Sequence, residues 1–155
     1  MRRLFIFVYL SIQTIMCFSQ IENATITYAE LDFMTTYSIP AQRFEQEFKS
    51  DCDTIVVSSE QEIEGLAKAL CSIKDTIYQE KVPDKIVNLP NGESIRFIMY
   101  PRMNTRGKIS VNFKNGNSKT YYYDRFTIWE ATEDKLYSMT DTFLSYIRGL
   151  PINKK

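Results

Sequence analysis

Alternation of apolar and polar positions predicts several short β-strands along the chain. Residues 24–32 alternate well enough for one strand, with Ile26 and Tyr28 at matching positions. The β-branched run at residues 53–57 predicts a second strand, and residues 126–130 predict another.

Apolar residues at three- and four-residue steps predict three helices, at residues 41–49, 59–77 and 140–148. The longest begins at Ser59, and Glu62 stands at the spacing of a capping box. The acidic residues near its start suit the positive end of the helix dipole. Its apolar stripe consists of Ile63, Leu66, Ala67, Leu70, Ile73 and Ile77.

A repeated pattern, VNLPNGES at residues 87–94 and VNFKNGNS at residues 111–118, predicts two hairpins with one turn design. Asn-Gly alone also suits a two-residue turn. Three-residue loops at residues 90–92 and 114–116, however, keep apolar residues on one face of each hairpin. We therefore interpret the repeat as turn geometry rather than chemistry. The two apolar sets are Val87, Leu89, Ile95, Phe97 and Met99, and Ile109, Val111, Phe113, Tyr121 and Tyr123.

Together these elements predict an α+β fold. We expect an antiparallel β-meander of about four to six strands, with the long helix and the C-terminal helix packed on one face. Residues 20–155 have a suitable length for a single domain.

The first residues have the features of a secretory signal peptide. Arg2 and Arg3 precede an apolar run at residues 4–10, and Ser19 is a suitable small residue before the cleavage point. We expect residues 1–19 to be removed and the protein to be exported, to a periplasmic or extracellular location. Two alternatives are an uncleaved anchor and a lipoprotein modified at Cys17.

The charge balance argues against a nucleic-acid partner. The chain has 19 basic and 19 acidic residues, and loss of Arg2 and Arg3 with the leader leaves a slight acidic excess. Nucleic-acid binding requires a basic surplus. The leader run is also shorter and more polar than a bilayer span requires, so no stable membrane span is expected after processing.

Cys52 and Cys71 are predicted to form a disulfide after export. An extended strand from Cys52 to Ser59 would span about 23 Å. If the next helix folds back along this strand, its length from Ser59 to Cys71 is about 18 Å, which brings the two cysteines close together. A bridge of this loop length contributes about 3 kcal/mol. The alternative is two small buried thiols.

The chain contains no histidine. Serine–histidine and cysteine–histidine catalytic pairs and imidazole metal sites are therefore excluded. We expect no metal and no cofactor. Chemistry by carboxylates alone remains open, as in glycoside cleavage. The candidates are Glu130, Glu133 and Asp134, which follow the last predicted strand.

The more informative feature is an aromatic face of the predicted sheet. Tyr, Trp and Arg are the residue types that anchor protein interfaces. The alternative is that the helix at residues 41–49 or the first strand covers this face and makes the aromatic rings part of the core. The candidate binding residues are Tyr100, Tyr122, Trp129, Arg96, Arg102, Arg106 and Arg125.

These features favour a small exported, non-catalytic protein that binds another protein through this face. In size and export the chain is similar to small periplasmic inhibitors and immunity-type proteins. Two alternatives follow from other classes of protein: a glycan-binding module or carboxylate-only glycoside hydrolase, and a structural component of the envelope.

Overall fold

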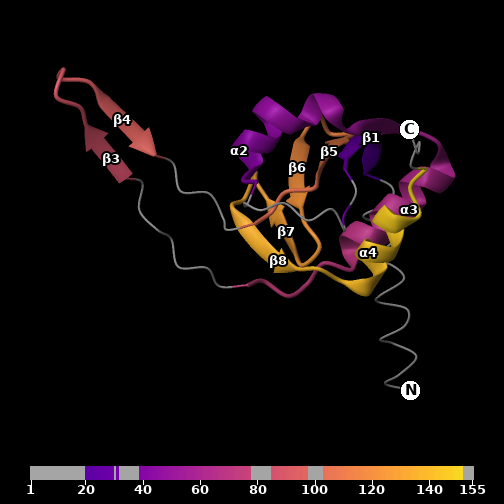
Figure 1. The fold of residues 1–155 in the computed structure, drawn as a ribbon. Helices are drawn as coiled ribbons and strands as arrows, with labels where there is room; N and C mark the ends of the chain where they lie inside the picture. The colour runs from indigo at the N-terminus through magenta and orange to yellow at the C-terminus, as the bar shows by residue number, and fades with distance from the viewer. Residues whose placement is uncertain (1–19, 30, 32–38, 78–84, 98–102, 152–155) are drawn as a thin grey trace.

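Six antiparallel strands form one sheet in the order β2-β1-β5-β6-β7-β8 (Figure 1). They are seen in a computed structural model that describes residues 20–29, 31, 39–77, 85–97 and 103–151. The α+β class and the antiparallel sheet are therefore confirmed. The strands are β1 (Ile21–Tyr28), β2 (Asp53–Val57), β5 (Gly107–Phe113), β6 (Ser118–Tyr123), β7 (Thr127–Glu130) and β8 (Lys135–Ser138).

Helices α3 (Glu60–Cys71) and α4 (Asp141–Arg148) lie on one face of this sheet, as predicted. The capping box at the start of α3 is present: the Ser59 hydroxyl accepts a hydrogen bond from the Glu62 backbone, and the Glu62 carboxylate accepts one from the Ser59 backbone. Thr140 caps α4 in a similar way. Each cap satisfies backbone groups that would otherwise lack a partner.

The long helix ends at Cys71, six residues earlier than predicted. Beyond it the chain becomes extended and pairs with the outer edge of β8. The Ser138 N–H donates to the Asp75 carbonyl at 3.1 Å, and the Ile77 N–H donates to the Leu136 carbonyl at 2.8 Å. The apolar residue Ile77 therefore belongs to a bridging segment rather than to the helical stripe.

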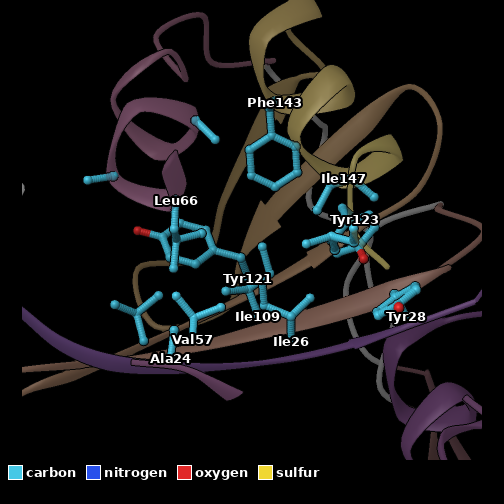
Figure 2. Close-up of a cluster of buried hydrophobic side chains, with 14 of the residues drawn as sticks. Ala24, Ile26, Tyr28, Val57, Leu66, Ile109, Tyr121, Tyr123, Phe143 and Ile147 are labelled. Atoms are coloured by element: carbon cyan, nitrogen blue, oxygen red, sulfur yellow. The ribbon is translucent and has the colours of Figure 1, made fainter. Parts of the chain in front are cut away.

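The main core lies between the sheet and these two helices. Figure 2 shows Leu66 of α3 with Phe143 and Ile147 of α4 above the inward side chains of the strands. Alternate residues of β1, β5 and β6 point into this layer, which is the side-chain periodicity of a half-buried sheet. The inward strand residues include Ala24, Ile26, Tyr28, Val57, Ile109, Val111, Tyr121 and Tyr123.

A third helical segment covers part of the opposite face. It consists of α2 (Ala41–Arg43), the π-helical turn η1 (Phe44–Phe48) and the 3₁₀ turn η2 (Lys49–Asp51), and we call it the covering helix. It confirms the helix predicted at residues 41–49. Figure 1 shows it on the side of the sheet away from α3 and α4.

Both repeated segments form hairpins with three-residue loops. The Phe113 N–H donates to the Asn117 carbonyl at 2.9 Å, and the Leu89 N–H donates to the Glu93 carbonyl at 2.7 Å. Gly116 and Gly92 have φ angles of 82° and 85°, the left-handed conformation that such a loop requires. The prediction of one turn design is confirmed.

The first hairpin nevertheless does not join the main sheet. Strands β3 (Lys85–Asn88) and β4 (Ser94–Phe97) form a separate two-stranded sheet, which Figure 1 shows set apart from the other strands. The six-stranded antiparallel sheet agrees with the predicted fold class, but this hairpin lies outside it. The reason is that β5 already pairs with β1 on one side and β6 on the other. No edge of β5 is left for β4.

Candidate functional site

The aromatic face of the sheet is covered, which was the alternative prediction for these residues. Trp129 is only 8% exposed and packs with Ala41 and Met103. Tyr122 is half-buried, and its hydroxyl donates to Glu45 of the covering helix at 2.9 Å. The two rings that were candidates for a binding surface therefore lie mainly between layers.

The described arginines that were predicted to surround that face do not form one group. Arg106 is buried at 4% exposure and lies near the charge of buried Asp124. Arg125 is exposed and lies over the ring of Phe126 at 5.7 Å. Arg96 lies in β4, in the separate hairpin. Tyr100 and Arg102 fall outside the described residues.

The three candidate catalytic carboxylates each have a structural partner. Lys119 Nζ lies 2.8 Å from Glu130 Oε1 and 2.6 Å from Glu133 Oε1. Hydrogen bonds from Lys119 and Lys135 hold the pKa of Glu133 at about 2. Asp134, at a φ of 53°, accepts the indole N–H of Trp129 at 3.2 Å. These contacts describe ion pairs and a turn, and they give no support to acid–base chemistry.

The predicted disulfide is not formed. Cys52 and Cys71 are separate thiols, and Cys52 Sγ donates to the Phe48 carbonyl at 3.1 Å. The reason is that α3 crosses the sheet instead of folding back along β2. Cys52 precedes the edge strand β2, whereas Ser72, next to Cys71, contacts Thr140 beyond β8 at 2.6 Å. These two edge strands are five strand spacings apart, or about 24 Å.

The two edges of the main sheet differ. The outer edge of β8 is paired with the bridging segment at residues 75–77. Strand β2 pairs with β1 alone among the described residues. Half of its backbone N–H and C=O groups therefore point outward without a strand partner.

Strand β2 also lacks the usual protection of an exposed edge. Its sequence, DTIVV, contains no lysine and no proline, and its one charged residue, Asp53, stands at its first position. Val56 is 65% exposed, on the face away from α3 and α4. An apolar, β-branched and unpaired edge is a ready template for another extended chain.

A groove of about 620 Å³ adjoins this edge. It lies between β2, the first half of α3 and the end of α4. We call β2 and this groove the β2 site. The residues that line the groove are Ile55, Val56, Val57, Gln61, Glu62, Gly65, Ser145, Tyr146, Gly149, Leu150 and Pro151.

Four polar side chains line the groove, those of Gln61, Glu62, Ser145 and Tyr146, and two of them are titratable. Glu62 is held by the capping box, and hydrogen bonds from Ser59 and Ser58 lower the pKa of its carboxyl. Burial, with a further contribution from the Glu62 charge, raises the pKa of Tyr146 to about 12. At neutral pH the groove therefore has one ionised carboxylate and a neutral phenol on a largely apolar wall.

Close packing of α3 on α4 forms the floor of the groove. A Cβ added to Gly65 would lie 3.3 Å from Cε2 of Tyr146, so the absent side chain allows the ring to approach the helix. The Tyr28 hydroxyl donates to the Pro151 carbonyl and holds the chain that follows α4 against β1. The groove is therefore built from elements tied to the main core.

The β2 site was not predicted from the sequence. The signal was present in part, because a strand of β-branched residues without lysine or proline is recognisable at residues 53–57. What the sequence did not reveal was that this strand lies at an edge, which depends on the order of the strands in the sheet.

Comparison with known proteins finds no matching family model, no matching curated protein and no matching solved structure. Among the described residues, no cluster of three or more Cys, Asp and Glu side chains is placed to hold a metal ion. None of the helices in the described part of the chain has the length and apolar character needed to cross a membrane.

Proposed function

We propose that the protein is a small exported, non-catalytic module that binds another protein by strand addition at the β2 site. The observation that carries this proposal is the contrast between the two sheet edges. The chain's own residues 75–77 pair with β8, whereas no other described segment pairs with the outer edge of β2, which lies beside a largely apolar groove. An extended segment of a partner has the geometry to fill both features at once.

Strand addition would use the backbone and the groove together. The outward N–H and C=O groups of β2 would pair with the backbone of the partner, which supplies affinity. Alternate side chains of an added strand point to opposite faces. Every second side chain of the partner would therefore point toward the groove, and the others would lie beside Val56, which is exposed on the opposite face.

The alternative functions receive no comparable support. Tyr122 and Trp129 stack on each other beneath the covering helix, so they present no broad aromatic surface for a sugar ring. The candidate carboxylates are engaged with lysines and with an indole N–H. Export rests on the leader at residues 1–19, which lies outside the described residues.

Selection from a library of random linear peptides of about twelve residues tests the proposal, since that length spans β2 and its flanks. Selected peptides are then measured by fluorescence anisotropy against the protein and two variants. Val56→Lys places a charge on the open edge, and Ile86→Lys makes the same change in β3 of the separate hairpin. The two positions are matched, with exposures of 65% and 63%.

We expect Val56→Lys to weaken binding at least tenfold, and Ile86→Lys to leave it unchanged. Hydrogen exchange on the complex should show new protection at the amides of β2. If the selected peptides bind both variants equally and protect other strands, binding occurs elsewhere and the proposal is wrong.

A further inference from the structure

We propose that the segment bound at the β2 site is basic at both of its ends, with a short alternating apolar core between them. This inference rests on the proposed function and specifies the chemistry of the partner. It follows from the charges that surround β2, from the length of the strand and from the apolar character of the groove.

Acidic residues lie on both sides of β2 along the chain. Residues 50–67 contain five acidic residues and no lysine or arginine. Asp51 and Asp53 stand at the start of the strand, and Glu60, Glu62 and Glu64 follow its end in α3. An extended segment along β2 would therefore meet negative charge at each end.

The helix dipole accounts for only part of this charge. The N-terminus of a helix has a positive partial charge of roughly half a unit. The three glutamates near the start of α3 exceed it several times over. Glu60 and Glu64 are exposed, and neither carboxylate forms an ion pair with any residue in the described part of the chain. The charge near the end of β2 therefore remains strongly negative.

The same charges argue against a second copy of this chain as the occupant. Antiparallel pairing of two β2 strands about Ile55 would place Asp53 opposite Val57 of the copy. Asp51 of each copy would then lie beside the acidic start of α3 in the other copy, so the same repulsion would occur at both ends of the interface. Like charges placed opposite each other on paired strands are destabilising. A partner with lysine or arginine at these positions gains attraction where a second copy meets repulsion.

The length of β2 sets the spacing of the basic residues. Its five residues span about 16 Å in extended conformation. The segment that fits best therefore has an apolar alternating core of about five residues between two basic flanks. The apolar side chains on one face would enter the groove, and the flanks would approach the acidic residues.

Three synthetic peptides test this inference. All share the core Thr-Val-Thr-Val-Thr, and their two flanks are Lys-Lys, Ser-Ser or Glu-Glu. Binding to the purified protein is measured by fluorescence anisotropy at low and at high salt. We expect the lysine-flanked peptide to bind at least tenfold more tightly than the serine-flanked one at low salt. High salt should reduce that ratio, because it screens exposed charges.

Two double variants locate the effect. Glu60→Gln with Glu64→Gln removes two exposed carboxylates that do not line the groove. Asp75→Asn with Glu93→Gln removes two exposed carboxylates near β8 and in the separate hairpin. We expect the first pair to reduce the preference for lysine flanks about threefold or more, and the second pair to leave it unchanged. Thermal midpoints measured alongside identify any loss that is due to unfolding.

The outcomes separate this inference from the proposed function. Equal affinity of the lysine- and serine-flanked peptides, with new protection of the β2 amides, would overturn the inference and leave strand addition standing. Absence of β2 protection with every peptide would overturn both. Concentration-dependent self-association that protects β2 would identify a second copy as the occupant and would also overturn the inference.

Discussion

Tyr122 and Trp129 stack on each other, with ring centroids 5.5 Å apart and an interplanar angle of 25°. They occupy paired positions on β6 and β7, and the covering helix lies over them. The pair joins the sheet to the covering helix, so it acts as a second, smaller core on the face opposite α3 and α4.

Replacement of Trp129 by alanine should therefore lower the free energy of unfolding by about 3 to 5 kcal/mol, the usual cost of removing a large buried aromatic side chain. Chemical denaturation measures this loss. Phe126→Ala is the control, because Phe126 is 71% exposed and its loss should cost less than about 0.5 kcal/mol. Similar small losses in both variants would show that Trp129 lies on the surface.

The ionised form of Glu45 should stabilise the protein against acid. Burial alone raises the pKa of this carboxyl, but hydrogen bonds from Lys108, Lys49 and Tyr122 outweigh burial, and the pKa lies at about 2. A depressed pKa in the folded state gives stability that is fully present above the unfolded value, and that stability is lost as the pH falls through the folded value.

In Glu45→Gln the free energy of unfolding should be lower by about 1 to 2 kcal/mol at pH 6, after allowance for solvent screening. The difference between variant and wild type should shrink as the pH falls from about 4.5 to 2, since both side chains are then neutral. Denaturation curves across this range provide the measurement. A constant difference at every pH would mean that the charge of Glu45 has no role.

The two turn glycines should respond differently to the same substitution. Gly116 and Gly92 share a positive φ, and an added Cβ would meet nothing within 4 Å at either position. Alanine therefore introduces only backbone strain, roughly 1 to 2 kcal/mol. Gly116→Ala should lower the global free energy of unfolding by that amount, because β5 and β6 belong to the main sheet.

Gly92→Ala should leave the global transition unchanged, because β3 and β4 pair with each other and with no other strand in the described part of the chain. Its effect should appear as faster hydrogen exchange within the separate hairpin. Equal losses of global stability in the two variants would show instead that both hairpins unfold as one cooperative unit with the sheet.

Cys52 and Cys71 should both be alkylated without prior reduction. In protein that lacks residues 1–19, and with them Cys17, the intact mass after denaturation and alkylation should show two modified thiols, because Cys52 and Cys71 lie near opposite edges of the sheet. Native Cys52 should react more slowly than a free thiol, since burial and then the charges of Asp51 and Asp53 raise the pKa of its thiol. Recovery of an unmodified, oxidised pair would contradict the strand order given above.

Local features of this protein were determined by its sequence. The alternation of apolar and polar residues along the strands predicted three-residue loops at Gly92 and Gly116. The spacing of Ser59 and Glu62 predicted the cap of α3. These features depend on residues close together in the chain, where steric limits and hydrogen bonding act without regard to the rest of the fold.

Tertiary structure decided which surfaces are exposed and which edges are open. The helix that covers Trp129, the crossing of α3 that separates Cys52 from Cys71, and the edge position of Val56 all depend on the order of strands in the sheet. That order results from competition among segments far apart in the chain for the same apolar surface and the same backbone partners. Alternation within one strand is the same at an edge and in the centre, so only the assembled sheet distinguishes them.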